Sequence, residues 1–163
     1  ANAQEVRVID NKGTIKTILK QTIAERYDTD GEVAITNNEL IIPFNAPGII
    51  DLNDYTTTIN SITIKKAGTY RVTYRVTAQI TSGTNRSGTE YILLKNDVVV
   101  PGSYSAAYHR TLAVSKDTAS ASRILVLAAL DVLKVQGKRY AGNNNTTIKT
   151  VAQGSSFLVE RIK

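Results

Sequence analysis

The sequence predicts an all-β protein, and three observations carry that prediction. Residues 69–81 alternate apolar and polar side chains without interruption. Threonine, valine, isoleucine and tyrosine, which favour strands, dominate the chain. Short segments of the same character follow one another from Leu40 onward, separated by turn-forming residues. A period of two residues is incompatible with a helix and describes a strand with one buried face and one solvated face.

The length and composition fit one globular domain with a sizeable core and a short appendage. The chain has 163 residues, of which 42% are hydrophobic and 21% charged, and both values are ordinary for a globular protein. Cysteine is absent. Packing, or packing combined with oligomerisation, therefore has to hold the fold without disulfides.

The net charge of +6 raises the question of an acidic partner. The basic residues are scattered, however, and the adjacent basic pairs are Lys65-Lys66 and Lys138-Arg139 alone. A nucleic-acid site usually clusters such residues beside exposed aromatic rings, so we expect no nucleic-acid partner. No apolar run approaches the ~20 residues that a membrane span needs, and we expect no membrane insertion.

The first part of the chain, residues 1–38, is polar and mixed, and is predicted to be a stalk or connector. Apolar residues recur there at helical spacing, and Thr14 is able to cap a helix over residues 14–27. The alternative is a hairpin in which residues 6–10 form a strand before the turn at residues 11–13. We favour the helix. The residues at helical spacing are Ile15, Ile18, Leu19, Ile23 and Tyr27.

Residues 39–163 are predicted to form a head domain of ten short strands. Strand-like runs alternate there with turn signals rich in glycine, asparagine and aspartate. Regular spacing of this kind favours a β-sandwich or a barrel. The predicted strands cover residues 40–44, 59–65, 68–81, 89–95, 98–100, 104–114, 121–128, 132–137, 146–152 and 156–162.

Several of these strands are apolar on both faces, as residues 91–94 and 124–128 illustrate. In an isolated antiparallel sandwich each strand should keep one wet face. Because large apolar patches usually mark interfaces, we expect a second copy of the same chain to cover the far face. The alternative cover is the N-terminal segment folded back onto the head.

Four fragments of the head are similar, in order and spacing, to the motifs of one known family. Residues 67–72 are similar to its Ala-Gly-x-Tyr-x-Phe strand, with Val72 in the aromatic position. Residues 91–102 are similar to its hairpin of leucine-asparagine-glycine followed by valine-proline-glycine. Residues 125–133 are similar to its Leu-x-Leu-x-x-Gly-Asp-x-Val turn, with Leu130 replacing the usual glycine. Residues 156–159 are similar to its closing strand without the glycine that normally follows.

Through these fragments, residues 40–163 resemble the trimeric jelly roll shared by the globular head of complement component one q and by tumour necrosis factor. The resemblance extends most closely to the bacterial branch, with the heads of spore-surface filaments and of phage fibres. It implies a ten-strand antiparallel jelly-roll sandwich that forms a homotrimer around a threefold axis, with the strands that are apolar on both faces near that axis. The interface residues expected on this basis are Tyr91, Leu93, Leu125, Leu127, Phe157 and Val159.

The residue types of common catalytic and metal sites are scarce. His109 is the only histidine, cysteine is absent, and no Gly-x-Ser-x-Gly motif occurs. His109 falls in a predicted strand and is interpreted as a plain strand residue. Nothing in the sequence singles out a carboxylate pair for glycoside chemistry. We therefore predict no enzyme activity, no cofactor and no catalytic residue.

Residues 28–32, with the sequence DTDGE, place alternating oxygen ligands beside a glycine, as calcium loops do. The segment departs from the full twelve-residue pattern, because Arg26 stands where the first ligand belongs and no glutamate closes the loop. An acidic turn is the better interpretation, and we predict no metal site.

Two polar segments, residues 81–88 and 140–147, are predicted to be exposed loop tips. Loop tips on a rigid β scaffold often carry recognition, and tyrosine with asparagine offers the stacking and hydrogen bonding that saccharide contacts use. The candidate ligand-binding residues are Asn85, Arg86, Tyr140, Asn143, Asn144 and Asn145.

The function expected from these observations is a non-enzymatic trimeric head on a fibre, displayed on the surface of a phage virion or a spore and able to attach to a surface. Its principal partner would be itself. The alternative is a recognition module whose loops bind a cell-surface saccharide or receptor.

Overall fold

The computed structural model describes residues 6–18, 21–83, 86–110, 115–142 and 146–163, and all regular structure in these ranges is β-strand. None of the described residues forms a helix that could cross a membrane. The strands are β1 (Val6–Ile9), β2 (Ile15–Ile18), β3 (Ile23–Tyr27), β4 (Ala34–Ile35), β5 (Leu40–Ile41), β6 (Ala46–Ile50), β7 (Tyr55–Thr58), β8 (Ser61–Ile64), β9 (Gly68–Ser82), β10 (Ser87–Lys95), β11 (Val98–Val99), β12 (Ser105–His109), β13 (Asp117–Leu127), β14 (Val132–Gly142), β15 (Thr147–Thr150) and β16 (Ser156–Arg161).

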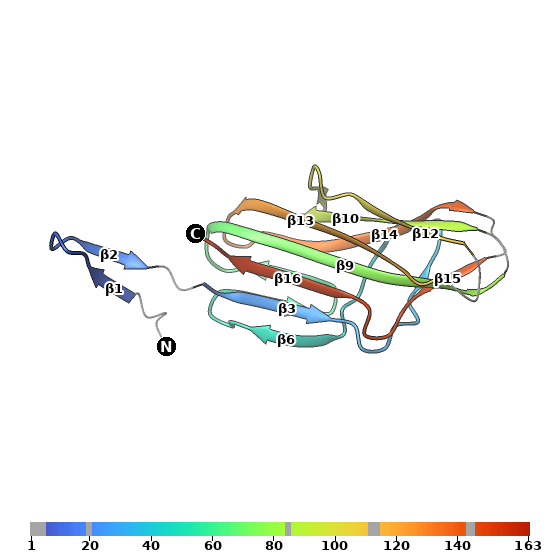
Figure 1. Cartoon of the computed structure of the whole chain (residues 1–163), viewed down its shortest axis with the longest axis horizontal. Coiled ribbons are helices and arrows are strands. Elements are labelled where there is room, and N and C mark those ends of the chain that lie inside the picture. The colour runs from blue at the N-terminus through green and yellow to red at the C-terminus, as the bar shows by residue number, and fades with distance from the viewer. Residues whose placement is uncertain (1–5, 19–20, 84–85, 111–114, 143–145) are drawn as a thin grey trace.

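Two sheets, each of seven strands in the described part of the chain, face each other as a sandwich (Figure 1). The outer sheet, as we name it, has the order β11-β10-β14-β8-β7, with β12 beside β10 and β5 beside β14. The inner sheet has the order β4-β15-β9-β16-β3-β6, with β13 beside β9. Every neighbouring pair is antiparallel. The predicted antiparallel jelly-roll sandwich is confirmed.

Strand β9 is the centre of the inner sheet and matches the alternating segment of the sequence. One edge of β9 pairs with β13, and the other edge pairs with β16 and then with β15. Its apolar face lies in the core, as the alternation predicts. The core residues of this strand are Tyr70, Val72, Tyr74, Val76, Ala78 and Ile80, each at most 2% exposed.

The helix predicted over residues 14–27 is wrong, and the alternative hairpin is confirmed. Strands β1 and β2 pair through a turn in which Gly13 has a φ of +75°. Asp10 closes the turn by accepting hydrogen bonds from the backbone N–H groups of Lys12 and Thr14, both at 2.9 Å. The rest of the predicted helix is β3, whose pairing with β16 and β6 satisfies its backbone. This hairpin pairs with neither sheet and lies beside the sandwich (Figure 1).

The predicted boundary between residues 1–38 and 39–163 also needs correction. Strands β3 and β4 belong to the inner sheet, so the head begins before Ile23 rather than at residue 39. The ten strands predicted from the sequence all have a counterpart in the structure. The additional strands of the head are β3, β4, β6 and β7.

The predicted interface residues lie inside the single chain. Tyr91, Leu93, Leu127, Phe157 and Val159 are each at most 1% exposed, and Leu125 is partly buried against the same core. Their side chains point between the two sheets, so they are covered without a neighbouring chain. The prediction that these residues form the interface is therefore corrected, because it chose the side chains on the inward face of each strand. On β13 the outward face carries Ile124 and Val126, with exposed fractions of 59% and 80%.

The core contains a close contact between a tyrosine and a glycine on adjacent strands. Gly137 of β14 lies opposite Tyr91 of β10 in the register of the outer sheet. A Cβ atom at Gly137 would lie 2.8 Å from Cδ1 of Tyr91 and 2.9 Å from Cδ1 of Ile42. Glycine at this position therefore leaves the space that the tyrosine ring occupies.

Candidate functional site

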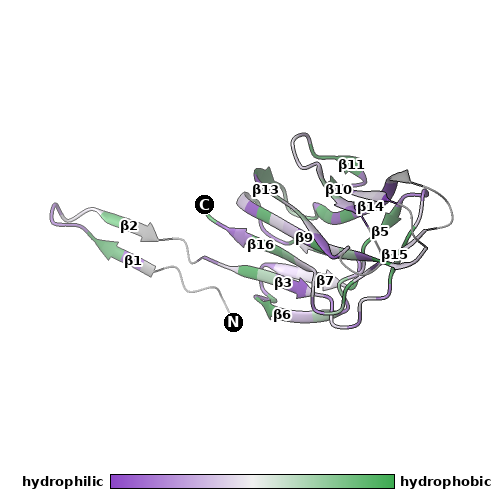
Figure 2. Ribbon diagram, turned by 45° about the vertical axis from the view of Figure 1, so that its right-hand side comes forward, coloured by the Kyte–Doolittle hydropathy of each residue, from purple (hydrophilic) through white to green (hydrophobic). Residues whose placement is uncertain are grey.

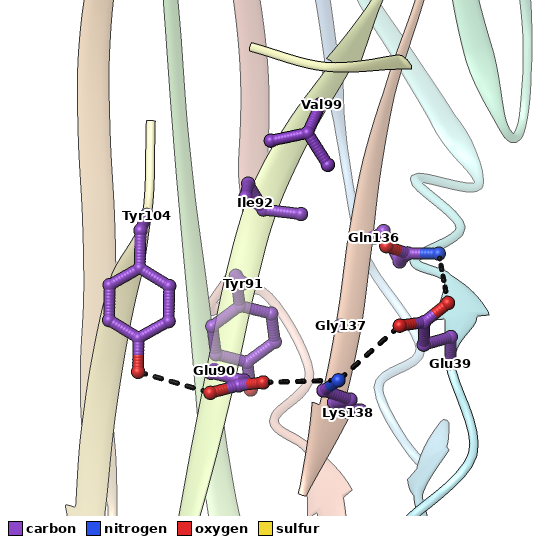
Figure 3. A pocket seen from close by; sticks show the side chains of 9 residues that line it. All are labelled: Glu39, Glu90, Tyr91, Ile92, Val99, Tyr104, Gln136, Gly137 and Lys138. Carbon is purple, nitrogen blue, oxygen red and sulfur yellow. Dashed lines mark hydrogen bonds and ion pairs between the residues drawn. The ribbon is translucent and has the colours of Figure 1, made fainter. Parts of the chain in front are cut away.

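A pocket of about 210 Å³ opens on the solvent face of the outer sheet, over β10, β11 and β14 and the residues just before β12 and β5 (Figure 3). Side chains on this face alternate with those that enter the core, so the residues at its rim come from every second position of β10 and β14. The lining residues are Glu39, Glu90, Tyr91, Ile92, Val99, Tyr104, Gln136, Gly137 and Lys138.

A chain of polar contacts crosses the pocket (Figure 3). Tyr104 donates a hydrogen bond from its hydroxyl to Oε2 of Glu90 at 3.1 Å. Nζ of Lys138 lies 3.5 Å from Oε1 of Glu90 and 3.3 Å from Oε1 of Glu39. Gln136 donates from Nε2 to Oε2 of Glu39 at 3.2 Å. Five side chains from four neighbouring strand segments are thereby held in fixed positions.

The charges of this network act on its titratable members. The hydrogen bond and charge of Glu39, with those of Glu90, raise the pKa of Lys138 above its ordinary value. Partial burial, followed by the hydrogen bond to Glu90 and its charge, raises the pKa of the Tyr104 phenol. At neutral pH, Lys138 is therefore a cation between two carboxylates and Tyr104 is a neutral hydrogen-bond donor.

The opposite part of the pocket is apolar. Val99 lies above Ile92 in Figure 3, with the ring of Tyr104 to their left, and Val99 is 49% exposed. The ring of Tyr104 is itself 56% exposed. The pocket thus combines an aromatic and aliphatic wall with a row of fixed hydrogen-bonding groups, which is the usual composition of a small-molecule site.

Of the six predicted ligand-binding residues, Asn85, Asn143, Asn144 and Asn145 lie outside the described residues. Arg86 is exposed. Tyr140 is 46% exposed on the same face as the pocket, and its ring occupies the space in which a side chain at Gly88 would lie. The sequence missed the carboxylate and lysine residues of the pocket, because they meet only through the register of separate strands.

His109 is buried and its ring is held by contacts within the fold. Its ring is fully buried, with Nδ1 donating to the backbone oxygen of Ser115 at 2.7 Å and Nε2 lying 3.0 Å from Oγ1 of Thr89. Both ring nitrogens are therefore used within the fold. The prediction of a plain strand residue is confirmed, since His109 is the last residue of β12.

The DTDGE segment forms an acidic turn. Oδ1 of Asp28 accepts hydrogen bonds from the backbone N–H groups of Asp30 and Gly31, each at 3.1 Å. Glu32 is paired with Lys149 at 2.7 Å. The described part of the chain contains no group of three or more histidine, aspartate or glutamate side chains placed to hold a metal ion.

Comparison with known proteins finds a match in fold and none to a family model or a curated sequence. No protein-family model matches the chain, and no curated protein matches it in sequence. The structure of Eiger TNF from S. frugiperda is similar to this chain with a TM-score of 0.60 at 13% identity, over 88% of this chain and 93% of that one. The chain has a tumour necrosis factor-like fold. The crystal structure of murine APRIL at pH 8.5 is similar with a TM-score of 0.59 at 9% identity, over 88% of this chain and all of that one.

Proposed function

We propose that this protein is a non-enzymatic head domain that forms a homotrimer and caps a fibre on the surface of a phage virion or a spore. The tumour necrosis factor-like fold supports a self-associating sandwich. The proposal agrees with the lack of cysteine, because a chain without disulfides is readily stabilised by association with its own copies.

The observation that carries the proposal is the exposed edge at β13. This strand of 11 residues pairs with β9, and in the described part of the sheet no strand forms a hydrogen-bonded ladder on its other edge, although β12 lies close to it. Ile124 and Val126 expose most of their side chains beside that edge, and Leu130, just beyond it, is 78% exposed. Long apolar edge strands are aggregation sites unless they are covered, so a specific partner surface is expected here.

The arrangement of the chain supports display on a fibre. The start of β3 and the C-terminal residue lie at the same end of the sandwich (Figure 1). The β1–β2 hairpin extends from that end and carries apolar residues in both strands (Figure 2). Ile9 and Ile15 of the hairpin are 68% and 60% exposed. An isolated two-stranded hairpin is marginally stable, so contact with neighbouring copies would stabilise it.

The test is the mass of the particle in solution, measured by size-exclusion chromatography with light scattering. The expected mass is about three times the chain mass of 17.7 kDa. The double variant Ile124→Lys/Val126→Lys should shift the protein toward the single chain without unfolding it. The matched control is Ile49→Lys/Leu52→Lys, because these residues are similarly exposed, at 68% and 70%. They lie at the β6 edge, opposite to β13 in the same sheet.

If the unmodified protein has the mass of a single chain at all concentrations, the proposed self-association is overturned. Dissociation by the control pair, with none by the β13 pair, would overturn the placement of the interface. The proposed display is tested separately, by labelling intact phage particles or spores of the source with an antibody to the head. Absence of label from particles that contain the chain would overturn that part.

A further inference from the structure

The pocket of the outer sheet has walls of two kinds that suit the two sides of a sugar ring. Ile92 and Val99 form an aliphatic part above the row of hydrogen-bonding groups, and the ring of Tyr104 stands at one end of that row (Figure 3). A pyranose likewise has a face of C–H groups and an edge of hydroxyls. We propose that this pocket binds one ring of a neutral saccharide.

The apolar wall provides the stacking surface. The negative face of an aromatic ring attracts the partly positive C–H groups of a ligand that lies flat against it. Tyr104 offers such a surface because it is exposed while its hydroxyl is held by Glu90 at 3.1 Å. The hydrogen bond fixes the position of the ring before a ligand arrives, which lowers the entropy lost on binding.

The polar wall retains hydrogen-bonding capacity after its internal contacts are counted. A carboxylate accepts about four hydrogen bonds and an ammonium donates three. Glu90 contacts Tyr104 and Lys138, and Lys138 contacts Glu90 and Glu39. Adjacent hydroxyls of a sugar can therefore donate to a carboxylate and accept from Lys138. This pairing is specific for neighbouring hydroxyl groups because the donor and acceptors are held side by side.

The charge of the pocket selects against acidic ligands. Its ionised side chains are Glu39, Glu90 and Lys138, so two negative charges face one positive charge. A uronic acid, a sialic acid or a phosphate would be repelled, whereas a neutral sugar meets no such cost. The overall positive charge of the chain, +6, does not reverse this local balance, because solvent and salt screen distant charges.

The size of the pocket suits one sugar ring, and further rings of a saccharide would extend into solvent. Its volume of about 210 Å³ is below the ~300–1,000 Å³ of pockets that enclose drug-sized ligands. All lining residues belong to one chain, so the inference goes beyond the proposed function and does not depend on self-association. Glycoside binding and particle mass are separate measurements on the same sample, so a failure of this inference is distinguishable from a failure of trimer formation.

The experiment is ligand-observed NMR on the full chain, with a panel of methyl glycosides of glucose, galactose, mannose and N-acetylglucosamine. Methyl glucuronide is the acidic comparator. At least one neutral glycoside is expected to bind more tightly than the glucuronide. Tyr104→Ala should weaken that binding about ten-fold or more, the ratio that about 1.4 kcal/mol produces. Tyr104→Phe keeps the ring and loses the hydroxyl, so its affinity for the glycoside should lie between those of the unmodified protein and Tyr104→Ala.

The matched control is Tyr27→Ala, which removes a partly exposed tyrosine, 38% exposed, from β3 in the other sheet. It should leave glycoside binding unchanged, and thermal unfolding should show that each variant is folded. The proposal is overturned if no neutral glycoside binds the unmodified protein. It is equally overturned if Tyr104→Ala and Tyr27→Ala bind alike, or if the glucuronide binds best.

Discussion

Asn96 donates a hydrogen bond from Nδ2 to Oδ1 of Asp131 at 2.7 Å, although the two residues are 35 positions apart in the chain. Oδ2 of Asp131 accepts from the backbone N–H of Ala128, and Oδ1 of Asn96 accepts from that of Val132, both at 2.8 Å. The turn after β10 and the turn before β14 therefore support each other through one buried carboxylate.

Asp131→Ala is predicted to destabilise the fold by about 1–3 kcal/mol, because it removes the buried carboxylate that accepts two part-buried hydrogen bonds between the turns. The free energy of unfolding in urea measures the effect. The control is Lys134→Ala, which removes an ion pair with Asp97, a carboxylate that is 70% exposed. Exposed pairs contribute about 0–1 kcal/mol, so equal losses in the two variants would contradict the prediction.

Leu130 occupies a left-handed backbone conformation, with a φ of +73°, while its side chain is 78% exposed. Leu130→Gly should stabilise the protein by about 0.5–1 kcal/mol, because the relief of backbone strain exceeds the added flexibility of the unfolded chain. Leu130→Ala keeps a Cβ at the same φ and should give no stabilisation. A gain in thermal midpoint for the alanine variant equal to that for glycine would indicate a different cause.

Asp54 is predicted to make the fold sensitive to acid. It is 2% exposed, accepts from Oγ1 of Thr22 at 2.8 Å, and lies 2.5 Å from Nζ of Lys66. Burial alone raises the pKa of Asp54, but the hydrogen bonds from Lys66 and Thr22 and the charges of Lys66 and Arg161 outweigh it and hold the pKa below 3.8.

Asp54 thus binds its proton at a lower pH in the folded protein than in the unfolded chain. Its stabilisation is fully present above about pH 3.8 and is lost as the pH falls through the folded-state pKa. The difference in unfolding free energy between the unmodified protein and Asp54→Asn should therefore shrink below that pH. A difference that stays constant from neutral pH to strong acid would contradict this assignment.

A substitution at Phe157 tests whether the residues on the inward faces of the strands stabilise the core of one chain or an interface between chains. Phe157 is 1% exposed, and its ring centroid lies 5.5 Å from that of Phe44. Phe157→Ala should cost about 3–5 kcal/mol of stability, and the folded fraction should keep the mass of the unmodified protein. The control is Leu158→Ala, on the opposite face of β16, which should cost less. A folded Phe157→Ala protein that dissociates would restore the interface assignment.

The fold could be predicted from the sequence where a strand is long enough to show its period. In β9 the alternation extends over most of 15 residues, so both the element and its buried face were predictable. Strands β2 and β3 have 4 and 5 residues, and their apolar positions fit helical and extended spacing equally. The pairing of β3 with β16 decides between them, and β16 lies at the other end of the sequence.

The inward face of β10 and β13 could not be read for a related reason. Both faces of these strands carry apolar side chains, so the choice depends on where the facing sheet lies. The pocket was missed because alternation gives the face of a residue and not its partner strand. Glu90 lies opposite Lys138 through the register of β10 and β14, and Glu39 joins them through β5.

The position of β16 has a consequence for the order of folding. This strand, Ser156–Arg161, lies between β3 and β9, although both are far from it in the sequence. Until β16 adds to the sheet, β3 pairs with β6 alone and β9 pairs with β13 and β15, so the inner sheet remains divided in two parts. The closure of a loop of more than 100 residues opposes this pairing entropically and slows it. The inner sheet is therefore expected to close late in folding, over milliseconds to seconds.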